Sequence, residues 1–256
     1  IYGSERNGGE STSHLRVPMN GSSTLLNLHG HIESFGSRGK PEWGHWDAIE
    51  LVNFHANALH NRISILFSIF VDPSDIYYNL LNPIPKNFQY WQALSEKERR
   101  PVPIFAGPDA HQNIGALGIR FDRYELMLGL VSTHVWLEEG KKLDQSAIFA
   151  AFKKGRTYIA FDCLGDPAGF QFCAKADGEN FFTGDIAHNP WFFDVDLPDS
   201  VGDSSGVEIK FYRDNQLIAT DKRDQYYNWE PKPGFWRVEI WKDGRLWIVS
   251  GQILVK

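Results

Sequence analysis

The stretch "PVPIFAGPDAHQNIG", residues 101–115, contains a run typical of a β-strand that is followed directly by polar residues, and the predicted fold depends on it. Its apolar, β-branched and aromatic run stops at Gly107 and Pro108, and Asp109 and His111 follow with one residue between them. A carboxylate and an imidazole two positions apart at a strand end can converge on one divalent metal ion. An isolated Asp-x-His is also compatible with an Asx turn beside a surface histidine, because Asp is a common turn residue.

Other short apolar runs of the first half resemble this one. Near-continuous runs of this length are typical of strands that are buried on both faces of a parallel sheet. We expect such strands at "STLLNLH" (23–29), "DAIELVN" (47–53) and "VPIFAG" (102–107).

Helical patterns lie after or between these runs. The segment "FQYWQALSEKERR" (88–100) carries Phe88, Trp91 and Leu94 at helical spacing. The segment "DQSAIFAAFKKG" (144–155) begins with an Asp suited to the N-cap, has two Lys in its last turn and ends in Gly. Alternating strands and helices predict an α/β layer or barrel.

The pattern changes to a period of two after about residue 160, and this predicts an all-β tail. Turn signals at 213–216 and 242–245 separate its runs, which suit a sandwich of roughly immunoglobulin-like size. Trp236 and Trp241 fall on opposite faces of one strand, so we expect at least one in a core, with a sugar-binding surface as the alternative. The expected strands are "QFCAKA", "WFFDVDL", "GVEIKFYR", "QLIATD", "GFWRVEIW" and "RLWIVSGQILV".

Composition limits the classes of function. The 256 residues are 42% hydrophobic, enough for one large domain or for one domain with a smaller second one. A formal charge of −6 and the lack of a basic cluster disfavour bulk nucleic acid as a partner. No apolar run approaches the length of a membrane span. The first ten residues have neither an initiator Met nor a signal-peptide pattern, so we expect a chain that starts within a domain, and the cytoplasm is the favoured compartment.

Several motifs together resemble the PHP superfamily (polymerase and histidinol phosphatase) of metal-dependent hydrolases. "GSE" at 3–5 is similar to the family's Gly-x-Glu, and a histidine follows about ten residues later, as in the family. "LLNLHGH" (25–31) and "GPDAH" (107–111) are similar to two later strand-end motifs, the second with Pro in place of Ser. "DAIELVN" and "FAAFKKGRTYIAFD" (149–162) resemble further family segments.

The resemblance implies a fold and a division of the chain. The expected fold is α/β, a distorted β/α barrel of PHP type followed by a small all-β sandwich-like domain. The family's opening His-x-His and Thr-Asp-His precede its Gly-x-Glu, whereas only four residues precede Glu5, so the barrel is expected to lack its N-terminal part. The expected domains are residues 1–162, PHP-like and partial, and residues 163–256, the β-domain.

The resemblance also implies a metal site. Carboxylates and neutral imidazoles suit Zn, Mn or Fe, and two or three such ions can generate a hydroxide while clamping a substrate oxyanion. Glu5, Asp109 and His111 are the expected catalytic residues. Arg16 and Arg120 are candidate phosphate clamps, or else merely solvated. The expected metal ligands are Glu5, His14, His29, His31, Asp109 and His111.

Function is therefore predicted at the level of reaction class. The first hypothesis is a metal-dependent phosphoesterase with a di- or trinuclear centre, which acts on a small phosphate ester through a metal-bound hydroxide. A carboxylester or carbamate hydrolase of the same superfamily is the alternative within that class. The hypothesis from a different class is a non-catalytic binding or assembly module with a degenerate PHP site.

Overall fold

The structure, a computed structural model, covers separate segments of the chain. For residues 2–7, 10–19, 22–29, 115–116 and 119–120 it describes the backbone alone. The described segments are residues 2–7, 10–19, 22–29, 47–54, 57, 81, 83–110, 115–116, 119–120, 123–137, 143–202, 206–221 and 231–256.

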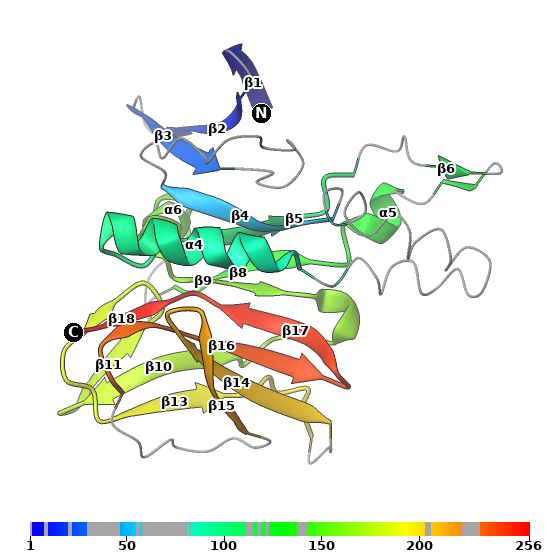
Figure 1. Cartoon of the computed structure of the whole chain (residues 1–256). Coiled ribbons are helices and arrows are strands. Elements are labelled where there is room, and N and C mark those ends of the chain that lie inside the picture. The colour runs from blue at the N-terminus through cyan, green and yellow to red at the C-terminus, as the bar shows by residue number, and fades with distance from the viewer. Residues whose placement is uncertain are drawn as a thin grey trace.

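A five-stranded sheet forms the N-terminal layer, at the top of Figure 1, in the order β1-β2-β3-β4-β5. The pairings β1–β2 and β2–β3 are antiparallel, whereas β3–β4 and β4–β5 are parallel. Its strands are β1 (Tyr2–Asn7), β2 (Glu10–Met19), β3 (Ser22–His29), β4 (Ala48–Asn53) and β5 (Ile104–Gly107).

The prediction of a distorted β/α barrel is wrong. The described part of the chain is mostly β, and its sheets do not close into a barrel. Residues 8–9 alone separate β1 from β2, and residues 20–21 alone separate β2 from β3. Connections of this length join antiparallel neighbours, because a parallel crossover needs a dozen or more residues. Within the five-stranded sheet, β3, β4 and β5 are the strands that keep the parallel arrangement that the barrel required.

Both predicted helices are confirmed. The first starts three residues earlier than expected, with Pro85 in its first turn, and Trp91 Nε1 donates to Val102 O at 2.9 Å. In the second, the Asp144 side chain accepts from Ala147 N at 2.9 Å, and Gly155 ends the helix in the left-handed region. No described helix is long and apolar enough to cross a bilayer. The helices are α4 (Pro85–Glu98), α5 (Tyr124–Met127), α6 (Gln145–Lys154) and the 3-10 turn η1 (Asp162–Leu164).

The predicted all-β tail is confirmed as two sandwich-like sheets. A three-stranded sheet, β11-β10-β13, packs on an eight-stranded sheet. Its strands are β10 (Gln171–Ala176), β11 (Glu179–Phe182) and β13 (Phe192–Asp196). The larger sheet contains β8 (Ser132–Val135), β9 (Thr157–Ala160), β12 (Ile186–Ala187), β14 (Val207–Arg213), β15 (Gln216–Asp221), β16 (Gly234–Lys242), β17 (Arg245–Ser250) and β18 (Ile253–Val255). A separate hairpin joins β6 (Gly115–Ala116) and β7 (Ile119–Arg120).

Two tight turns explain why the tail pairs as hairpins. Asp214 and Asn215 have φ of 49° and 62° between β14 and β15, and Asp243 and Gly244 have φ of 51° and 75° between β16 and β17. Positive φ at both central residues belongs to the turn type whose twist matches paired strands, and Asn, Asp and Gly adopt it at low cost. The turn signals read from the sequence are therefore the structural turns.

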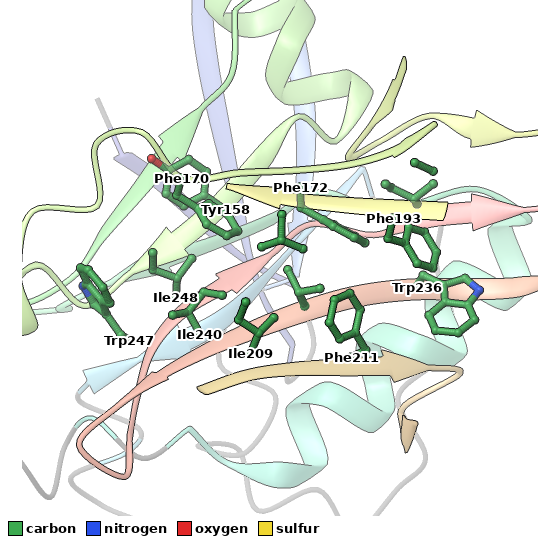
Figure 2. Close-up of a cluster of buried hydrophobic side chains, with 14 of the residues drawn as sticks. Tyr158, Phe170, Phe172, Phe193, Ile209, Phe211, Trp236, Ile240, Trp247 and Ile248 are labelled. Atoms are coloured by element: carbon green, nitrogen blue, oxygen red, sulfur yellow. The ribbon is translucent and has the colours of Figure 1, made fainter. Parts of the chain in front are cut away.

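The central strands β9, β16 and β17 of the eight-stranded sheet are buried on both faces, whereas β15 at its edge is largely exposed. On one face, Tyr158, Ala160 and Ile248 join the core that the three-stranded sheet closes with Phe172 and Phe193 (Figure 2). The opposite face supplies a second core, which it shares with α4 and with strands β4 and β5. The sheet's side of that core is formed by Ile159, Phe161, Leu246 and Val249.

The tryptophans of β16 fit this two-sided arrangement. Trp236 is 1% exposed in the sandwich core, whereas Trp241 packs against the second core, as expected for residues on opposite faces of a strand. Lys210 Nζ covers the Trp241 ring at 3.7 Å from its centroid. Packing thus accounts for both rings, as the core interpretation predicts.

The division of the chain at 162/163 stays a prediction. The eight-stranded sheet takes strands from both sides of it, because β9 pairs with β17 and β8 pairs with β9. Both cysteines are free thiols, of which Cys173 is buried and Cys163 is exposed.

A buried ion pair lies where α4 meets β16. Arg237 and Glu239 are 3% and 4% exposed, and Arg237 Nη2 donates to Glu239 Oε1 at 2.9 Å. The guanidinium also lies over the rings of Phe88 and Tyr212, and Trp241 Nε1 donates to Glu239 Oε2 at 3.1 Å. Burial lowers the pKa of Arg237, and the negative charge of Glu239 opposes that shift.

We expect Glu239→Ala to lower the free energy of unfolding by about 3–5 kcal/mol, because it leaves the Arg237 charge buried without its partner. The double variant Arg237→Met/Glu239→Leu removes both charges, so it should lose less stability than the single variant. Urea unfolding followed by circular dichroism measures both. A double variant less stable than Glu239→Ala would contradict this account.

Candidate functional site

The carboxyl ends of β4 and β5 lie side by side and form the described part of the candidate site. The two strands are parallel, and Asn53 pairs with Gly107 at their ends. Asn53 is 3% exposed, and its Nδ2 donates to Glu50 Oε2 at 3.1 Å. A Cβ added to Gly107 would lie 3.1 Å from Glu50 Oε1, so the carboxylate rests directly against the backbone of this glycine.

Asp109 stands two residues past the end of β5, in an uncommon backbone conformation. Its φ is 49°, in the left-handed region that Asp tolerates better than most residues do. The side chain is partly exposed, and the following residue, Ala110, packs against the second core. The chain therefore brings a second carboxylate to the edge where Glu50 lies, and ligands of open sheets that contain parallel strands bind at this edge.

The pairing register of β1, β2 and β3 relates the positions of three of the predicted ligands. Glu5 in β1 pairs with Thr12 in β2, two residues from His14. His14 in turn pairs with Asn27 in β3, which is two residues from His29. Directly opposed residues and residues two apart in a strand belong to one face of a sheet. By register, the positions of Glu5, His14 and His29 therefore belong to one face, in neighbouring rows.

The remaining predicted residues are distributed differently. Arg16 is two positions from His14 in β2 and pairs with Leu25. Arg120 pairs with Gly115 in the separate hairpin β6–β7, outside the five-stranded sheet. The positions of His31 and His111 lie outside the described residues.

The register divides the predicted ligands into two groups. His29 pairs with Ile49, which pairs in turn with Ile104 of β5. The end of β5 at Gly107 is three residues further along, roughly 10 Å at about 3.3 Å per residue. The positions of Glu5, His14 and His29 thus lie about three residues along the sheet from the end of β5, which precedes Asp109 and which the Glu50 carboxylate contacts at Gly107.

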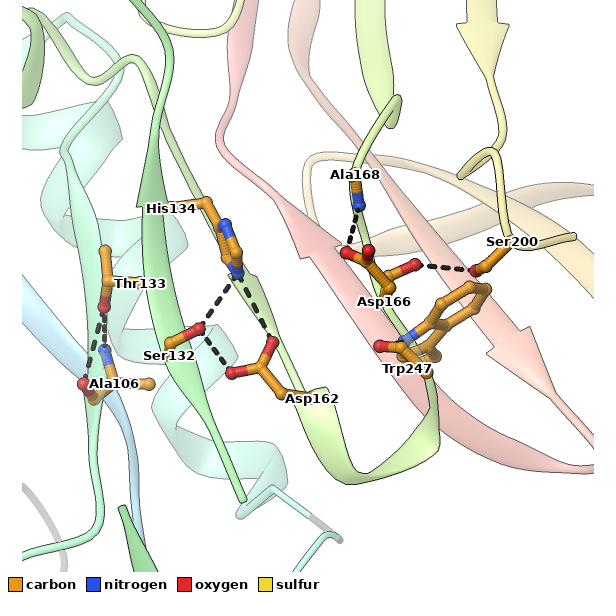
Figure 3. Close-up of polar contacts among 10 residues, drawn as sticks. Ala106, Ser132, Thr133, His134, Asp162, Asp166, Ala168, Ser200 and Trp247 are labelled. Atoms are coloured by element: carbon orange, nitrogen blue, oxygen red, sulfur yellow. Dashed lines mark hydrogen bonds and ion pairs between the residues drawn. The ribbon is translucent and has the colours of Figure 1, made fainter. Parts of the chain in front are cut away.

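A different polar cluster joins β8 to the first residue of η1, which follows β9 (Figure 3). Ser132 Oγ donates to Asp162 Oδ2 at 2.5 Å, and His134 Nε2 lies 2.9 Å from Ser132 Oγ and 3.4 Å from Asp162 Oδ1. The His134 ring stacks on Tyr158, with centroids 4.6 Å apart and planes 10° apart. The His134 and Asp162 side chains are 33% and 29% exposed.

This cluster differs from a nucleophilic triad in its geometry. A triad uses one ring nitrogen of the histidine for the serine and the other for the carboxylate. Here Nε2 of His134 faces both partners, and the Ser132 proton points to Asp162. The hydroxyl is therefore already bound to a carboxylate, and the cluster holds two strand ends together.

Two carboxylates affect Tyr158 beneath this cluster. Burial raises the pKa of Tyr158 to about 12, and the negative charges of Asp162 and Asp166 add to the shift. Asp166 itself is held in a turn, where its Oδ1 accepts from Ala168 N at 3.0 Å. The phenol consequently stays protonated over the whole physiological pH range.

The described side chains include no group of three or more His, Cys, Asp and Glu residues arranged to hold a metal ion. A metal site at the β4–β5 edge would therefore need ligands beyond Glu50 and Asp109. Sequence reasoning did not assign Glu50 as a site residue, although its strand "DAIELVN" was compared with a family motif. The sequence feature that could have identified Glu50 is its position three residues before Asn53, which ends the strand.

Comparison with known proteins returns no match to this chain among protein-family models, curated sequences or solved structures.

Alkaline pH should weaken the fold through Tyr158. Its folded pKa of about 12 lies above the ordinary value of 10.0, so the stability it contributes is complete below pH 10 and is lost as pH rises to about 12. Tyr158→Phe should reduce this decline in the free energy of unfolding, measured by urea titration at several pH values. A variant that declines as steeply as the wild-type chain would refute the assignment.

Proposed function

We propose that this chain is a divalent-metal-dependent hydrolase, and within that class a phosphoesterase. One observation carries the proposal: Glu50 and Asp109 come to the same edge of the sheet, at the adjoining carboxyl ends of β4 and β5. Carboxylate oxygens are preferred ligands of Mg²⁺ and Mn²⁺, and with imidazoles they also suit Zn²⁺. His111, two residues after Asp109, is the imidazole proposed to complete this group.

The register of β1, β2 and β3 supports a second group of ligands on the same sheet. A carboxylate and two imidazoles, from Glu5, His14 and His29, form a suitable set for Zn²⁺, Mn²⁺ or Fe²⁺. His31 is the proposed companion of His29. Metal ions held by these residues would supply a hydroxide at neutral pH and positive charge for the substrate oxyanion.

A phosphate ester is the proposed substrate, and the position of Arg16 favours it. Arg16 is on the same strand as His14, two positions away, so both positions belong to one face of the sheet. A guanidinium beside metal ligands is suited to bidentate binding of phosphate oxygens. Arg120 is the less suitable clamp, because its hairpin is separate from this sheet.

The test combines metal binding with hydrolysis. Asp109→Asn and Glu50→Gln should each lower Mn²⁺ affinity at least about 10-fold, since each removes charge from the ligand group. Isothermal titration of the metal-free chain with Mn²⁺ and with Zn²⁺ measures affinity, and p-nitrophenyl phosphate measures the reaction. The matched control is Glu179→Gln, which alters an exposed carboxylate on β11 and should leave both properties unchanged.

Each alternative has its own outcome in this assay. Hydrolysis of p-nitrophenyl acetate but not of the phosphate would replace the phosphoesterase with the ester or carbamate hydrolase. Failure of the wild-type chain to bind either metal or to hydrolyse either substrate would refute the enzyme and favour a non-catalytic module.

A further inference from the structure

We draw no further inference here: the strongest candidate, the surface patch formed by the exposed side chains of Leu217 and Ile218 on the edge strand β15, carries no proposal, because nothing in the described part of the chain shows what covers it.

Discussion

Strands β9 and β17 pair between the two hydrophobic cores and contribute side chains to both. These strands are buried on both faces, with Ile248 opposite Ala160 and Val249 opposite Ile159. Alternate residues therefore build the sandwich core on one side and the core under α4 on the other. Because β8 and β9 also hold the outer edge of β5 through Thr133 and Thr157, the candidate site is supported from the same pair of strands.

Local patterns predicted those elements whose signal is contained in a few residues. The helix after Asp144 carries its own N-cap and ends in Gly155, and the hairpin turns contain the Asn, Asp and Gly residues that their backbone angles require. The strands of the tail alternate in the expected way. These features depend on steric contacts and hydrogen bonds between residues close in the sequence, so the sequence alone predicts them.

The barrel was predicted wrongly because strand direction is not a local property. The run at 23–29 suited a strand of a parallel sheet, but β3 pairs antiparallel with β2 on one side and parallel with β4 on the other. Strand β2 consists mainly of polar residues. Its alternation of His14 and Arg16 with Leu15 and Val17 is the pattern of a half-buried strand, and the two-residue separations from its neighbours excluded crossovers.

The candidate site was predictable in part. Asp109 was selected from the way its strand ends, and the structure places it at a carboxyl edge of the sheet. Strand-end position alone did not indicate that His29 and Asp109 belong to different levels of the sheet, because that difference is set by the register between strands. Nor did it indicate that the Thr133 hydroxyl would accept from the backbone of Ala106, because these residues are 27 positions apart.

Anomalous diffraction from crystals soaked with Mn²⁺ locates a bound ion without reference to activity. If Asp109 is a metal ligand, an anomalous peak lies within coordination distance of its carboxylate at the β4–β5 edge and is absent in crystals of Asp109→Asn. Crystals of the wild-type chain with no peak there, or with the same peak in Asp109→Asn, would contradict this assignment.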